Sequence, residues 1–115
     1  MVGRSHQVLV VLVTCPSRRS ALQVAETLIA RRLAACVNIV PGVTSIYRWQ
    51  GKTERATEML LVIKTTRPVF GRMKKAILAV HPYDVPEIIA MPVERGHQAY
   101  LGWVVQSTQT VRPPQ

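Results

Sequence analysis

A continuous apolar run near the start of the chain, at residues 8–13, constrains the fold more than any other feature. A strand with one face in water alternates apolar and polar residues, whereas this run does not alternate and is rich in β-branched side chains. Such a run is typical of a strand buried on both faces. We therefore expect residues 7–15 to form a central strand of a sheet.

The rest of the chain reads as an alternation of strands and amphipathic helices. In the helix after Ser17, its expected N-cap, the apolar positions are Ala21, Ala25, Leu28, Ile29 and Leu33. The expected elements after the first strand are a helix at 17–33, a strand at 34–49 bent at Pro41-Gly42, a turn at 50–52, an antiparallel return strand at 56–65, a helix at 67–80, a connection at 81–86, a strand at 87–93, a helix at 97–108 and a frayed tail at 111–115. This order predicts an α+β, ferredoxin-like βαββαβ fold with an additional C-terminal helix.

In that fold both main helices cover one face of the sheet, yet residues 8–13 and 59–63 are apolar on both sides. The second face therefore needs a cover, which is either the last helix or another copy of the chain. The length of 115 residues fits a single domain, 1–115, with an ordered core at about 7–107.

The composition narrows the class of protein. No apolar stretch approaches the roughly 20 residues that cross a bilayer, and no signal peptide opens the chain, so we expect a cytoplasmic protein without a membrane partner. The two cysteines are expected to be buried thiols. The net charge of +9 comes from scattered basic residues without interleaved aromatic ones, which predicts no specific nucleic-acid partner.

The stretch HPYDVPEIIA, residues 81–90, carries the candidate chemistry. Pro82 and Pro86 make it a stiff connection between a helix and a strand. His81 and Cys15 are expected to converge at the end of the first strand, where they are the candidate ligands for Cu or another divalent cation that is not needed for folding. The alternative is that His81 is a hydrogen-bonded structural residue and Cys15 a small core residue.

The sequence carries no signature of an enzyme, because it has no nucleophile–base pair and no phosphate-binding glycine loop. Glu58, Lys64, Tyr83 and Glu87 are the other polar candidates, and they serve either a ligand cleft or a subunit interface. Glu58 and Lys64 are six residues apart on one side of a strand, where a structural ion pair is as plausible as catalysis. Trp49, Tyr83 and Trp103 are candidates to line a cleft for a small ligand between subunits. The alternative, which is the more common role of aromatic residues, is that they fill the core of a subunit interface.

Several segments together resemble the CutA family of divalent-cation tolerance proteins over residues 7–107. They are RRLAACVNIVPGVTSIYRWQGK, TEMLLVIKT, HPYDVPEIIAMPVERG and YLGW, in the family's order. The resemblance implies a homotrimer similar in architecture to PII signalling proteins, with a role in copper or divalent-metal tolerance. Copper-linked relatives carry a cysteine at the position of Val13 and a second histidine at that of Val80, so His81 is the ligand that carries over directly. We therefore expect a non-catalytic metal-tolerance protein; the alternative is a PII-like sensor of a small ligand at the cleft between subunits.

Overall fold

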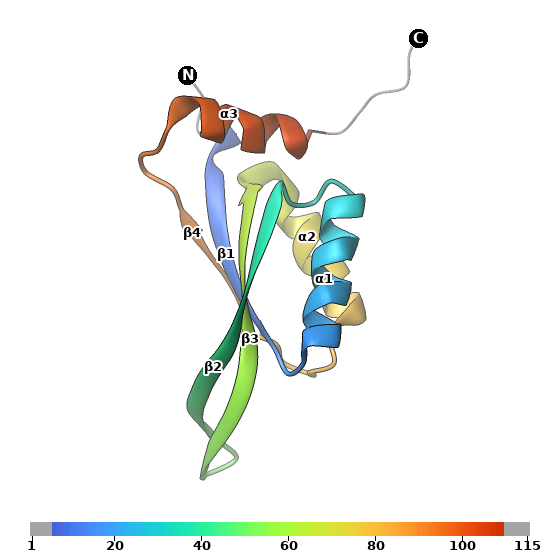
Figure 1. Cartoon of the computed structure of the whole chain (residues 1–115), viewed down its shortest axis with the longest axis vertical. Coiled ribbons are helices and arrows are strands. Elements are labelled where there is room, and N and C mark those ends of the chain that lie inside the picture. The colour runs from blue at the N-terminus through green and yellow to red at the C-terminus, as the bar shows by residue number, and fades with distance from the viewer. Residues whose placement is uncertain (1–5, 110–115) are drawn as a thin grey trace.

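The computed structural model describes residues 6–109 and has the predicted order of elements (Figure 1). In chain order these are β1 (Val8–Cys15), α1 (Arg18–Ala30), β2 (Cys36–Trp49), β3 (Lys52–Thr66), α2 (Arg67–Val80), β4 (Ile88–Pro92) and α3 (Gln98–Ser107). The frayed tail expected at 111–115 lies outside the described residues.

Strand β1 lies inside the sheet, as its unbroken apolar sequence predicts. It is antiparallel to β3 on one side, where Val11 is opposite Ile63, and to β4 on the other, where Val11 is opposite Ala90. With β2 paired to β3, the strand order is β2-β3-β1-β4. The fold is therefore the predicted ferredoxin-like α+β arrangement, with β2 and β4 as the two edge strands.

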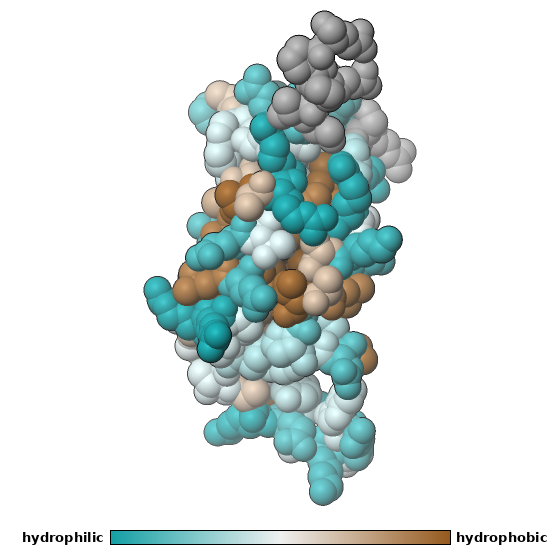
Figure 2. Space-filling model, turned by 90° about the vertical axis from the view of Figure 1, so that its right-hand side faces the viewer, coloured by the Kyte–Doolittle hydropathy of each residue, from teal (hydrophilic) through white to brown (hydrophobic). Residues whose placement is uncertain are grey.

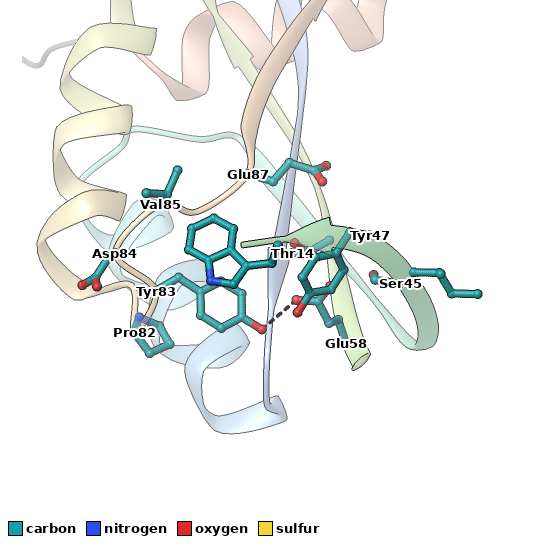
Figure 3. Close-up of a pocket in the computed structure, with 11 residues that line it drawn as sticks. Thr14, Ser45, Tyr47, Glu58, Pro82, Tyr83, Asp84, Val85 and Glu87 are labelled. Carbon is teal, nitrogen blue, oxygen red and sulfur yellow. Dashed lines mark hydrogen bonds between the residues drawn. The ribbon is translucent and has the colours of Figure 1, made fainter. Parts of the chain in front are cut away.

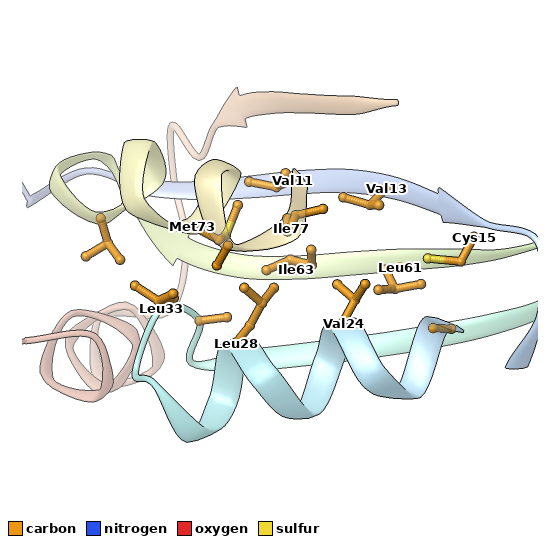
Figure 4. Packing of buried hydrophobic residues seen from close by; sticks show 14 of the residues in the cluster. Val11, Val13, Cys15, Val24, Leu28, Leu33, Leu61, Ile63, Met73 and Ile77 are labelled. Carbon is orange, nitrogen blue, oxygen red and sulfur yellow. The ribbon is translucent and has the colours of Figure 1, made fainter. Parts of the chain in front are cut away.

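Helices α1 and α2 lie together on one face of this sheet (Figure 1). Figure 4 shows Leu28 of α1 and Ile77 of α2 directed at the sheet, with Ile63 of β3 between them. All three side chains are fully buried. Burying a side chain of this size stabilises a fold by about 1.5–3 kcal/mol, so this layer holds the helices on the sheet.

The ends of α1 follow from local hydrogen bonds. Ser17 is the N-cap, as predicted, and forms a capping box in which its hydroxyl accepts from the Ser20 amide at 3.1 Å. At the other end Arg32 has a φ of 57°, and the Leu33 amide donates to the Leu28 carbonyl at 2.8 Å. The prediction that the helix extends to Leu33 was wrong, because this capping turn directs Leu33 into the core from outside the helix. Ile29, expected on the apolar face, is 46% exposed.

Strands β2 and β3 form a long hairpin that extends beyond the helices (Figure 1). The register shifts between Val40 and Val43, and Gly42 has a φ of 72°, so the bulge predicted at Pro41-Gly42 is confirmed. Positive φ angles at Gln50 (50°) and Gly51 (79°) close the hairpin in the manner of a type I′ turn. The return strand begins at Lys52, four residues earlier than predicted.

The face of the sheet opposite α1 and α2 is only partly covered. Helix α3 packs at one end of the sheet, where Val104 is fully buried and the Thr66 and Thr108 hydroxyls are 3.1 Å apart. Elsewhere this face carries apolar side chains that are half-buried or exposed. They are Val10, Leu12, Leu60 and Val62 in the middle strands, and Val40, Ile89 and Met91 at the edges. Of the two predicted covers, the last helix therefore accounts for only one end.

The helix side of the molecule is polar. Figure 2, which views the side where Figure 1 places α1, shows a mostly hydrophilic surface with apolar residues gathered near its middle. The basic residues of the two helices are all exposed: Arg18, Arg19, Arg67, Arg72, Lys74 and Lys75. Among residues 6–109, no helix has the length and apolar character needed to cross a membrane.

Candidate functional site

His81 is placed by the end of α2. Its amide donates to the Ile77 carbonyl at 2.8 Å, and its own backbone is extended, with a φ of −74° and a ψ of 135°. Pro82 cannot donate an amide hydrogen bond and disfavours a helical conformation in the residue before it, so the helix ends here as predicted. The imidazole is only 8% exposed and points back towards the end of β1.

Both nitrogens of the His81 ring are engaged by the backbone. Nδ1 accepts a hydrogen bond from the Tyr83 amide at 3.1 Å, so the proton of the neutral ring is on Nε2, which donates to the Thr14 carbonyl at 2.8 Å. The ring therefore ties the connection after α2 to the end of β1, which is the structural role weighed in the sequence analysis.

Cys15 lies beside this ring, with its sulfur 3.7 Å from His81 Nε2, so the predicted convergence of the two side chains is confirmed. Burial raises the pKa of the Cys15 thiol to about 11; a hydrogen bond with Ser20 opposes this rise and the negative charge of Glu58 adds to it. The thiol is thus protonated at neutral pH, and a metal ion must displace its proton to bind. Within residues 6–109, no group of three or more His, Cys, Asp or Glu side chains is placed to hold a metal ion. Both Cys15 and Cys36 are free thiols.

A second polar contact lies next to His81. The Tyr83 hydroxyl donates to Glu58 Oε2 at 2.8 Å (Figure 3), and the rings of Tyr83 and His81 have centroids 5.1 Å apart. Glu58 is 6% exposed although it is a carboxylate. Burial, the hydrogen bond to Glu58 and the charge of Glu58 raise the pKa of Tyr83 to about 12. Tyr83 therefore stays protonated at neutral pH and can keep donating to Glu58.

Glu58 and Tyr83 line a pocket of about 700 Å³ between the hairpin and the connection after α2 (Figure 3). It is lined by Thr14, Ser45, Ile46, Tyr47, Trp49, Glu58, Pro82, Tyr83, Asp84, Val85 and Glu87. Sequence reasoning missed the pocket positions of Ser45 and Tyr47. The available signal was their spacing of four and two residues from Trp49, which places all three on one face of a strand.

Other predicted site residues lie elsewhere. Lys64 donates from Nζ to Asn38 Oδ1 and does not line the pocket. The ion pair considered between Glu58 and Lys64 was wrong, because six residues of strand separate them by about 20 Å. Trp103 lies on α3, where its ring centroid is 5.6 Å from that of Tyr100, whereas Trp49 and Tyr83 do line the pocket.

Comparison with known proteins gives one consistent result. The model of a family described as CutA1 divalent ion tolerance protein matches residues 9–107. A relative from Thermus thermophilus, called divalent-cation tolerance protein CutA, is 52% identical over 99 residues, which are 86% of this chain and 96% of the relative. A relative from Arabidopsis thaliana called "Protein CutA, chloroplastic" is 44% identical over 101 residues, and the match spans 88% of this chain but only 56% of that relative.

A solved structure gives the same result for the fold. The divalent cation tolerance protein (Cut A1) of Thermus thermophilus superposes with a TM-score of 0.87 at 50% sequence identity, covering 89% of this chain and 99% of that one. The resemblance predicted from the sequence segments is therefore confirmed, and so is the fold.

Proposed function

Because the chain belongs to the CutA1 divalent ion tolerance family, we propose that it is a non-catalytic protein that binds copper or another divalent cation through His81 and Cys15. The observation that carries this proposal is the distance of 3.7 Å between Cys15 Sγ and His81 Nε2. Thiolate and imidazole are the ligands that soft and borderline metals prefer. Family membership supports the metal-related role, and the geometry supports the choice of residues.

The protons that His81 Nε2 and the Cys15 thiol now carry predict a modest affinity for a metal ion. A metal on His81 Nε2 replaces the proton that is now donated to the Thr14 carbonyl, and a metal on Cys15 must displace a thiol proton whose pKa is about 11. The protein then supplies two ligands, so water or a residue of another subunit completes the coordination. The metal is therefore not required for folding.

Calorimetric titration of the metal-free protein with Cu and Zn ions tests this proposal. We expect His81→Ala and Cys15→Ser each to weaken binding by at least about tenfold, or roughly 1.4 kcal/mol. His97→Ala and Cys36→Ser are matched controls, because they remove the same chemical groups away from the site. Unchanged affinity in both site variants contradicts the proposal.

We also propose that the active form is a homotrimer in the cytoplasm. The support comes from the edge strands β2 and β4, which are free to pair with other copies, and from the uncovered apolar face beside them. Light scattering should give about three times the 12.8 kDa chain mass. A monomer that persists at micromolar concentration contradicts this assembly.

A second candidate function is a PII-like sensor of a small ligand. It is favoured by the pocket that Glu58 and Tyr83 line, whose volume suits a small molecule. No catalytic step is part of either candidate, and we expect any contact with nucleic acid to be weak, sequence-independent and lost with added salt.

A further inference from the structure

Glu58 is a buried carboxylate without a cationic partner in the part of the chain that the structure describes. Its side chain is 6% exposed, and it accepts a hydrogen bond on Oε2 from Tyr83. Among residues 6–109 no Lys, Arg or His side chain forms an ion pair with it. A buried charge is unfavourable unless an opposite charge or several hydrogen bonds compensate it. The Glu58 site therefore favours any cation that can reach its second oxygen, Oε1.

The surroundings of Glu58 make the pocket negative on a basic protein. The chain has 15 Lys and Arg against 6 Asp and Glu, yet three of these six acidic residues, Glu58, Asp84 and Glu87, line this one pocket. No Lys or Arg is among the described residues that line it. Glu58 is at its buried end, while Asp84 and Glu87 are exposed. The field in the pocket therefore excludes anions and attracts cations.

The shape of the pocket favours an organic cation over a metal ion. Within the described residues the carboxylates do not gather into a group that could hold a metal ion, and the space of about 700 Å³ is that of a small-molecule site. Three aromatic residues line it: Tyr47, Trp49 and Tyr83. Aromatic faces attract ammonium and guanidinium groups and also contact the apolar part of such a molecule.

We infer that this pocket binds a small organic cation, a primary ammonium or guanidinium compound, whose charged head lies on Glu58 and whose apolar part contacts the aromatic residues (Figure 3). This site goes beyond the metal binding proposed above, because neither His81 nor Cys15 is a contact of the ligand. It gives the small-ligand candidate a defined chemical class.

Calorimetry on the full chain with four probes of matched length tests the inference. The probes are n-butylammonium, n-butylguanidinium, neutral n-butanol and anionic butyrate. We expect saturable binding of one molecule per chain for the two cations and none for the other two. Lack of saturation by both cations, or equal affinity for butanol, overturns the inference.

Variants then locate the site. Glu58→Gln keeps the shape and removes the charge, and it should weaken binding of the cations by at least about tenfold, whereas Glu94→Gln, exposed and outside the pocket, should not. Trp49→Leu on the exposed hairpin should weaken the binding of the cations by about threefold. Unchanged affinity in Glu58→Gln overturns the assignment; if that variant does not fold, the charge series on the unmodified chain still decides.

Two further outcomes separate this site from metal binding. Cys15→Ser should keep its affinity for butylammonium even if it loses copper, so each proposal can fail alone. If Zn²⁺ displaces the organic cations, and Glu58→Gln weakens Zn²⁺ binding as well, the pocket is a metal site and the inference is wrong.

Discussion

Replacement of His81 by alanine should destabilise the protein by about 2–3 kcal/mol. The imidazole makes two hydrogen bonds that join the connection after α2 to β1, one to the Thr14 carbonyl at 2.8 Å and one from the Tyr83 amide at 3.1 Å. Each contributes about 1 kcal/mol net, and the buried ring adds a further amount of about 1 kcal/mol through lost packing. The sum is large for a substitution in a connecting segment.

Urea unfolding followed by tryptophan fluorescence, with a chelator present, measures this loss. The comparison must be made at one protein concentration, because the stability of the proposed trimer depends on it. His97→Ala is the matched control, since His97 is exposed and its side chain does not cap α3; its effect should lie within about 0.5 kcal/mol. A loss below about 1 kcal/mol for His81→Ala refutes the argument that the ring holds this connection.

Three other predictions test separate parts of the structure. Tyr83, with its pKa raised to about 12, should ionise at higher pH than an ordinary tyrosine, and Glu58→Gln should lower the pKa of Tyr83; an alkaline titration of absorbance measures both. The stability linked to Tyr83 is complete below pH 10 and lost as the pH rises through about 12, which unfolding measured over this pH range checks. Gly51→Ala, at a φ of 79°, should cost about 1 kcal/mol in thermal unfolding, whereas Gly102→Ala, with open space at its Cβ in α3, should be neutral or stabilising; equal effects contradict the turn geometry. Fully buried Cys15, with its pKa near 11, should be alkylated by iodoacetamide far more slowly than half-buried Cys36, and equal labelling in a mass spectrum contradicts its burial.

The sequence predicts the sheet well because the strongest signals are local. The apolar run at residues 8–13 requires a strand with neighbours on both sides, and the structure places β1 between β3 and β4. Gly42 and Gly51 have the positive φ angles that glycine tolerates, so the bulge and the turn were also predictable. Leu33 was misplaced because helical spacing continues through a capping turn that a period of 3.6 residues does not detect.

The candidate site was only partly predictable. Proline after His81 indicated where α2 ends, and the return of that helix brought His81 to Cys15. The pocket depends instead on how the hairpin lies against the connection that contains Tyr83, and periodicity carries no information about that tertiary contact. The burial of Glu58 has the same origin, because Tyr83, which donates to it, comes from a segment 25 residues away in the sequence.

X-ray absorption at the zinc edge, on the protein loaded with one equivalent of Zn²⁺, tests most directly whether His81 and Cys15 share a metal ion. The proposal predicts one sulfur at about 2.3 Å from the metal and nitrogen or oxygen neighbours at about 2.0–2.1 Å, with the sulfur lost in Cys15→Ser and retained in Cys36→Ser. A shell of oxygen and nitrogen alone in the unmodified protein contradicts it.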